Sequence, residues 1–87
     1  MKHARPDYNR IQDPAKLIPE DEPVFLIRAQ DKVAPAALEF YADLAAGHGA
    51  SQQVINSVVT HAQAMRAWQR ENGSKVPDMP VDEPNDD

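Results

Sequence analysis

The hydrophobic residues of this chain recur most regularly between Ser51 and Gly73. They follow steps of three and four residues, which places them on one face of a helix with 3.6 residues per turn. This apolar face consists of Val54, Ile55, Val58, Val59, Ala62 and Met65, with Trp68 at its edge. Ser51 can cap the first turn, and Gly73 can end the helix in the left-handed conformation. The pattern predicts a long amphipathic helix that needs a packing partner along its length.

A second apolar stripe precedes Gly47 and predicts a helix over residues 35–46, because Pro35 is tolerated only in a first turn. Its predicted buried face consists of Ala37, Phe40, Tyr41, Leu44 and Ala45. The connection around His48 is short, which favours antiparallel neighbours. We therefore predict a mainly α fold with an antiparallel helical hairpin domain over residues 21–73.

The apolar run at residues 23–29 (PVFLIRA) permits two interpretations. Its Val, Phe and Ile favour a strand, whereas Asp21, Glu22 and Pro23 are typical of the first turn of a helix. Periodicity does not separate a buried strand from a buried helix at this length. We favour a short helix; a strand stays open as the alternative if two subunits pair these segments across a two-fold axis.

Both ends of the chain are rich in proline. Residues 1–20 hold three prolines among charged residues, which predicts an arm without a long helix or an interior strand. Residues 74–87 hold three prolines, one Lys and five acids, which predicts a disordered acidic tail. This tail accounts for four of the five net negative charges of the chain, so the remainder is nearly balanced.

The composition limits how the fold is stabilised and what it binds. A chain of 87 residues without cysteine has a small core and no disulfides, so we expect a homo-oligomer. No basic stripe is present, which disfavours duplex nucleic acid. No apolar run is long enough for a membrane span, and the first ten residues lack the apolar region of a signal peptide. We therefore expect a cytoplasmic protein without membrane contacts.

A few residues could carry binding chemistry. His61 falls in the row Val54, Val58, His61, Met65 and Trp68, at the margin of the apolar face. It is interpreted as a packing histidine or, alternatively, as a ligand-contacting or pH-sensitive one. A metal ligand is disfavoured, because no His or Cys lies three or four residues away. Glu39 and Asp43 are interpreted as a solvated helix face. Tyr8 anchors the arm or, with Arg10, holds a nucleobase and a phosphate.

The run Thr60-His61-Ala62-Gln63, followed by Met65 and Arg66, resembles the second helix of the helical-hairpin family that includes the phage anti-CBASS and anti-Thoeris sponges. The chain departs from that pattern after Gln63, where the family places a Gly-aromatic pair before the Met. The resemblance implies oligomers of hairpins that sequester cyclic nucleotides or related host immune signals without cleaving them. The small size, Pro-rich arm and acidic tail also resemble accessory proteins of bacteriophages and prophages, whose location would be the host cytoplasm.

These observations lead to one functional hypothesis and one alternative. The first is a non-enzymatic, phage-type oligomer that sequesters a small nucleotide-like host signal, with no catalytic residue, cofactor or metal. Its candidate ligand-binding residues are Tyr8, Arg10, Arg28, Lys32, His61 and Arg66. The alternative is a protein–protein inhibitor or adaptor that binds a host or phage protein through its hairpin face or its acidic tail.

Overall fold

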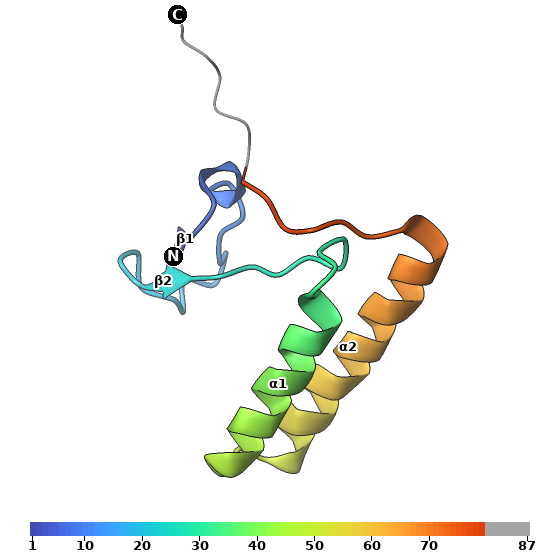
Figure 1. Cartoon of the computed structure of the whole chain (residues 1–87). Helices are drawn as coiled ribbons and strands as arrows, with labels where there is room; N and C mark the ends of the chain where they lie inside the picture. Colours follow the sequence, from blue (N-terminus) through green and yellow to red (C-terminus); the bar gives the residue numbers. More distant parts are fainter. Residues whose placement is uncertain (80–87) are drawn as a thin grey trace, which may run out of the picture. The chain divides into compact units, whose positions relative to one another are not determined.

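The computed structural model describes residues 1–79 and contains two helices and a short strand pair (Figure 1). Its elements are β1 (Lys2–His3), the 3₁₀ helix η1 (Pro6–Tyr8), β2 (Pro23–Val24), α1 (Ala34–Gly47) and α2 (Gln52–Asn72). The chain forms two compact units: the first is Met1–Leu26 with the chain from Asp78, and the second is Ile27–Pro77. The expectation of a mainly α protein is confirmed. None of the helices in the described part is long and apolar enough to cross a membrane.

The long helix predicted between Ser51 and Gly73 is confirmed as α2. The Ser51 hydroxyl accepts a hydrogen bond from the backbone N–H of Val54 at 3.3 Å, which satisfies a donor that the first turn leaves open. At the other end Gly73 adopts φ +85°, and its N–H donates to the Gln69 carbonyl at 2.7 Å. Serine and glycine therefore fix the two ends of α2 by local chemistry.

The shorter predicted helix is confirmed as α1, with Pro35 in its first turn. The helix ends where the N–H of His48 donates to the carbonyls of Leu44 and Ala45, both at 3.1 Å. Gly49 follows at φ +86°, a conformation that glycine adopts without steric cost. Residues 48–51 then connect α1 to α2, which lie side by side (Figure 1).

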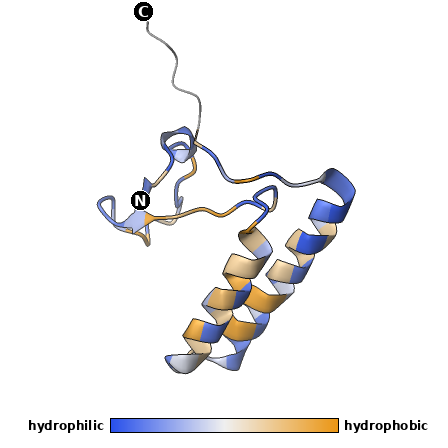
Figure 2. Ribbon diagram, viewed as in Figure 1, coloured by the Kyte–Doolittle hydropathy of each residue, from blue (hydrophilic) through white to orange (hydrophobic). Residues whose placement is uncertain are grey.

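The surfaces through which α1 and α2 meet are made mainly of small residues. The buried hydrophobic side chains are Ala34 and Ala42 of α1 with Ala62 and Met65 of α2. Among the described residues no large side chain is fully buried. Most of α1 is hydrophobic in colour, whereas the last turns of α2 are hydrophilic (Figure 2).

The prediction of which face α1 buries was therefore wrong in part. Phe40, Tyr41 and Leu44 are exposed by 66%, 60% and 53%. Ala34 and Ala42 belong instead to a different helical stripe, spaced by multiples of about four residues. Alanine lets two helix backbones approach closely, so this stripe faces α2 and leaves the bulky stripe outside.

The first unit corrects the interpretation of residues 23–29. The segment forms no helix; Pro23 and Val24 make a two-residue strand, and the rest is irregular. Its partner is the N-terminal arm of the same chain, in parallel register, with Lys2 opposite Pro23 and His3 opposite Val24. The Met1 amino group also donates to the Pro19 carbonyl at 2.7 Å. The arm therefore provides the strand partner for Pro23 and Val24, although its prolines had made it an unfavourable candidate for strand pairing.

The segment before α1 is tied to the far end of α2 and to the chain after it. The Gln69 side-chain amide donates to the carbonyls of Ala29, at 2.9 Å, and Asp31, at 3.0 Å. Lys32 N–H donates to the Lys75 carbonyl at 2.6 Å, and Lys75 N–H donates to the Gln30 carbonyl at 2.8 Å. Part of the predicted disordered tail is thus hydrogen-bonded chain, while residues 80–87 lie outside the described residues.

Candidate functional site

An apolar groove lies along α1 and α2. It encloses about 450 Å³, and it is lined by Ile27, Ala37, Leu38, Tyr41, Ser57, Val58 and His61. The first of these residues comes from the segment before α1, the next three from α1 and the last three from α2. The groove therefore exists only because three separate segments pack together.

Exposed hydrophobic side chains continue the groove along both helices. Phe40 and Leu44 stand three or four residues from Ala37 and Tyr41 on α1, which puts all four on one stripe. On α2, Val54 and Trp68 belong to the row that contains Val58 and His61, and each is 44% exposed. We call the groove together with Phe40, Leu44, Val54 and Trp68 the open face. An apolar surface of this extent on a small protein is typical of an interaction site.

The polar groups of the open face are few. They are the hydroxyls of Tyr41 and Ser57, the imidazole of His61 and the indole N–H of Trp68. None of the residues that define this face is Asp, Glu, Lys or Arg. The face is therefore suited to burying apolar surface, with a few hydrogen bonds to fix orientation.

Arg66 forms an ion pair that joins α2 to α1. Its guanidinium donates two hydrogen bonds to the carboxylate of Glu39, one of them at 3.0 Å. The hydrogen bonds with Arg66 lower the pKa of Glu39, and those with Glu39 raise the pKa of Arg66. Glu39 thus does more than present a solvated helix face. No sequence signal links two residues that lie 27 positions apart.

The six residues predicted to bind a ligand are divided between the two units. Tyr8 and Arg10 belong to the first unit, and the other four belong to the second. Of those four, His61 lines the groove and Arg66 is paired with Glu39. Arg28 and Lys32 are exposed in the segment that precedes α1.

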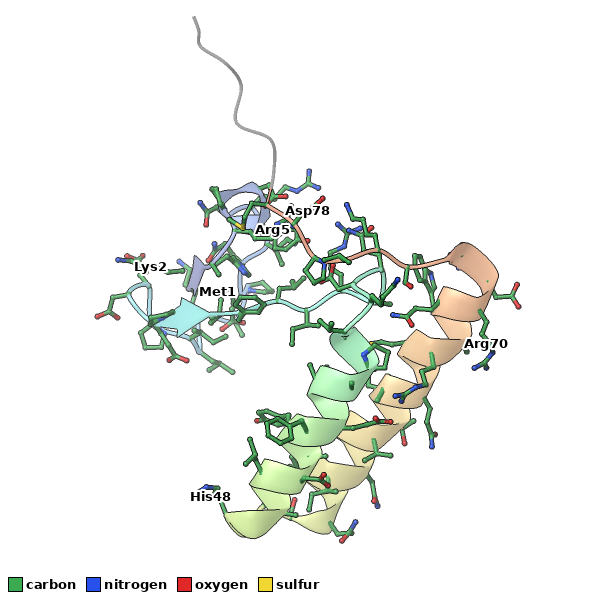
Figure 3. The ribbon with its side chains drawn as sticks, in the orientation of Figure 1. Met1, Lys2, Arg5, His48, Arg70 and Asp78 are labelled. Atoms are coloured by element: carbon green, nitrogen blue, oxygen red, sulfur yellow. The ribbon has the colours of Figure 1, made fainter. Side chains whose placement is uncertain are left out.

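Around Tyr8 the structure shows a cluster that the sequence analysis missed. The Arg5 guanidinium lies 5.0 Å from the centre of the Tyr8 ring. It also donates to the Asp7 carboxylate at 3.0 and 2.8 Å and to the Asp78 carbonyl at 2.5 Å. Arg5 and Asp78 lie next to each other in Figure 3. The hydrogen bonds to Asp7 raise the pKa of Arg5. The sequence signal that could have predicted this cluster is the two-residue spacing of Arg5 and Asp7, which have opposite charges.

No group of three or more His, Cys, Asp or Glu residues within the described chain could hold a metal ion. Comparisons with protein-family models, with curated proteins and with solved structures find no match to this chain.

Proposed function

We propose that this protein is a non-enzymatic binding protein that acts through protein–protein contacts, as an inhibitor or adaptor. In this proposal α1 and α2 form an antiparallel helical hairpin, and the open face binds an amphipathic helix of a protein partner. The observation that carries the proposal is the apolar groove lined by Tyr41, Val58 and His61, whose lining includes no Asp, Glu, Lys or Arg and which has large hydrophobic side chains exposed along both of its sides.

The chemistry of the groove supports a helix as the ligand. Helices bind in apolar grooves through side chains spaced at i, i+3, i+4 and i+7, which follow the ridges of two packed helices. Tyr41 and Trp68 are the residue types that contribute most to binding energy when a partner covers them. The Tyr41 hydroxyl and the His61 imidazole can donate or accept hydrogen bonds at the edges of such a helix.

Sequestration of a nucleotide-like signal stays a prediction, and the groove favours it less. A phosphate needs a cation or a cluster of N–H donors. The residues that line the groove include no Lys or Arg, and Arg66 already makes two hydrogen bonds to Glu39. To bind Arg66, the phosphate of a nucleotide would have to displace the Glu39 carboxylate from the guanidinium. An apolar helix can bind in the groove without breaking this ion pair.

A selection experiment tests the proposal. A displayed library of amphipathic helical peptides is selected on the wild-type protein, and each selected peptide is measured by fluorescence anisotropy. Tyr41→Glu places a carboxylate in the groove, so we expect it to weaken binding at least about 10-fold, because the covered charge has no partner. Thr60→Glu is the matched control, since Thr60 is an exposed residue of α2 that does not line the groove.

Two results would contradict the proposal. The first is a selection that yields no peptide above background, and the second is equal binding to Tyr41→Glu and Thr60→Glu. Native mass spectrometry with a nucleotide mixture reports the competing hypothesis in the same samples. A gain of the mass of one nucleotide per site, lost in Arg66→Gln, would favour sequestration.

A further inference from the structure

We infer that the first occupant of the open face is the open face of a second copy of this chain, so that the free protein is a symmetric dimer of helix pairs. The inference rests on the proposed function, in which the groove binds a helix. It states that, in the absence of another protein, this helix belongs to a second copy of the chain. Four observations support a second copy.

The first observation is the seven-residue repeat on α2. Val54, Val58, His61, Met65 and Trp68 follow alternating steps of four and three, the spacing of a seam between packed helices. Met65 is buried and Val58 half-buried, whereas Val54, His61 and Trp68 are exposed. The contact with α1 therefore covers only one flank of this seam. The other flank has the periodicity to receive another helix.

The second observation is that α1 carries two apolar stripes and uses one. Its alanine stripe faces α2, while the stripe with Phe40, Tyr41 and Leu44 stays exposed. Helices with two apolar stripes are typical of bundles, where each helix contacts two neighbours. Two copies that meet through their open faces supply the second neighbour for every helix.

The third observation is the size of the open face. A fully exposed aromatic side chain offers about 200 Å², so the exposed fractions of Phe40, Tyr41 and Trp68 with Leu44 and Val54 amount to roughly 500 Å² per copy. If these side chains are fully covered, two copies together bury roughly 1,000 Å², which is about the least area that a specific interface needs. The face therefore has the area of a small dimer interface.

The fourth observation is the distribution of charge. Four of the five net negative charges of the chain lie in residues 74–87, so the rest of the chain is nearly balanced and its charge does not oppose contact through the open face. The open face holds no Asp, Glu, Lys or Arg, and a two-fold contact brings the same patch of each copy together. The residues that define this face therefore place no like charges opposite each other.

Self-association through the groove regulates the proposed function. A helix of a partner protein and a second copy compete for Tyr41, Val58 and His61. The apparent affinity for a partner then falls as the protein concentration rises, because only the dissociated fraction can bind.

Sedimentation equilibrium of the full chain, from about 1 µM to about 1 mM, tests the inference. We expect a mass of twice 9.7 kDa at the upper end, where the monomer has 9.7 kDa. Tyr41→Glu should weaken the dimer at least about 100-fold, because two carboxylates become buried together. Thr60→Glu should leave it unchanged. Val54→Glu is a second variant at an exposed position of the same face, and circular dichroism verifies that each variant keeps its helices.

The outcomes separate this inference from the proposed function. A protein that stays monomeric at 1 mM, or a dimer that neither Tyr41→Glu nor Val54→Glu weakens, would overturn the inference. Selected helical peptides that bind such a monomer would still support the proposed function. A dimer that depends on both residues, with peptide affinity falling at high protein concentration, supports the inference.

Discussion

Replacing Ala62 by Leu tests the conclusion that small residues set the distance between α1 and α2. Ala62 is 0% exposed, and the other buried hydrophobic residues of the two helices are Ala34, Ala42 and Met65. A leucine there adds three carbon atoms to a surface where α1 and α2 are closely packed. Overpacking of this kind typically destabilises a protein by about 1–3 kcal/mol. For a domain of this size, that corresponds to a decrease in Tm of about 4–8 °C for each kcal/mol.

The assay is thermal unfolding followed by circular dichroism at one fixed protein concentration, because self-association would make Tm depend on concentration. Ala64→Leu is the matched control: it makes the same chemical change on the same helix at an exposed position. We expect its Tm to shift little, since surface substitutions are usually within about 0.5 kcal/mol. Equal Tm values for the two variants would refute the close packing of α1 and α2 through alanine.

Three further predictions concern local features of the helix pair. Ser51→Ala removes the cap of α2 and should lower the free energy of unfolding by about 0.5–2 kcal/mol, measured with urea. Gly73→Ala should lower Tm because φ is +85° there, whereas Gly47→Ala, in a helix with open space around it, should raise Tm; the same sign for both would contradict the assigned conformations. The lowered pKa of Glu39 means that its pair with Arg66 stabilises the fold above the ordinary value of 4.5 and is lost as the pH falls further. Between about pH 5 and about pH 3, Tm should therefore fall more steeply in the wild type than in Glu39→Gln, and parallel curves would show that the pair does not stabilise the fold.

The open face connects these predictions to function. The same substitution, Tyr41→Glu, is expected to weaken both peptide binding and self-association, because both use the groove that contains Tyr41. Ala62→Leu acts on the buried contact between α1 and α2 within one copy. A comparison of the two variants therefore separates loss of the binding surface from loss of the helix pair itself.

Local signals in the sequence were sufficient to predict the helices. Ser51 and Gly73 mark the ends of α2, and Pro35 marks the first turn of α1. Caps, turns and apolar periodicity act between residues three or four positions apart, so one segment contains all the information. The four- and three-residue spacing also places His61 in the row of Val58 and Met65, and the structure shows that His61 lines the groove.

Only the tertiary structure decided which surfaces meet. Both stripes of α1 are apolar. Whether the stripe of Ala42 or the stripe of Tyr41 packs against α2 depends on how closely the two helices approach, and the local sequence pattern does not determine that distance. The pair of Arg66 and Glu39 and the contribution of Ile27 to the groove join segments far apart in the chain. The sequence by itself determined the helices because their interactions are local. The groove forms where separate segments of the chain pack together, and the exposed stripe is the one that does not pack against α2. Which segments contact each other depends on the fit between their side chains.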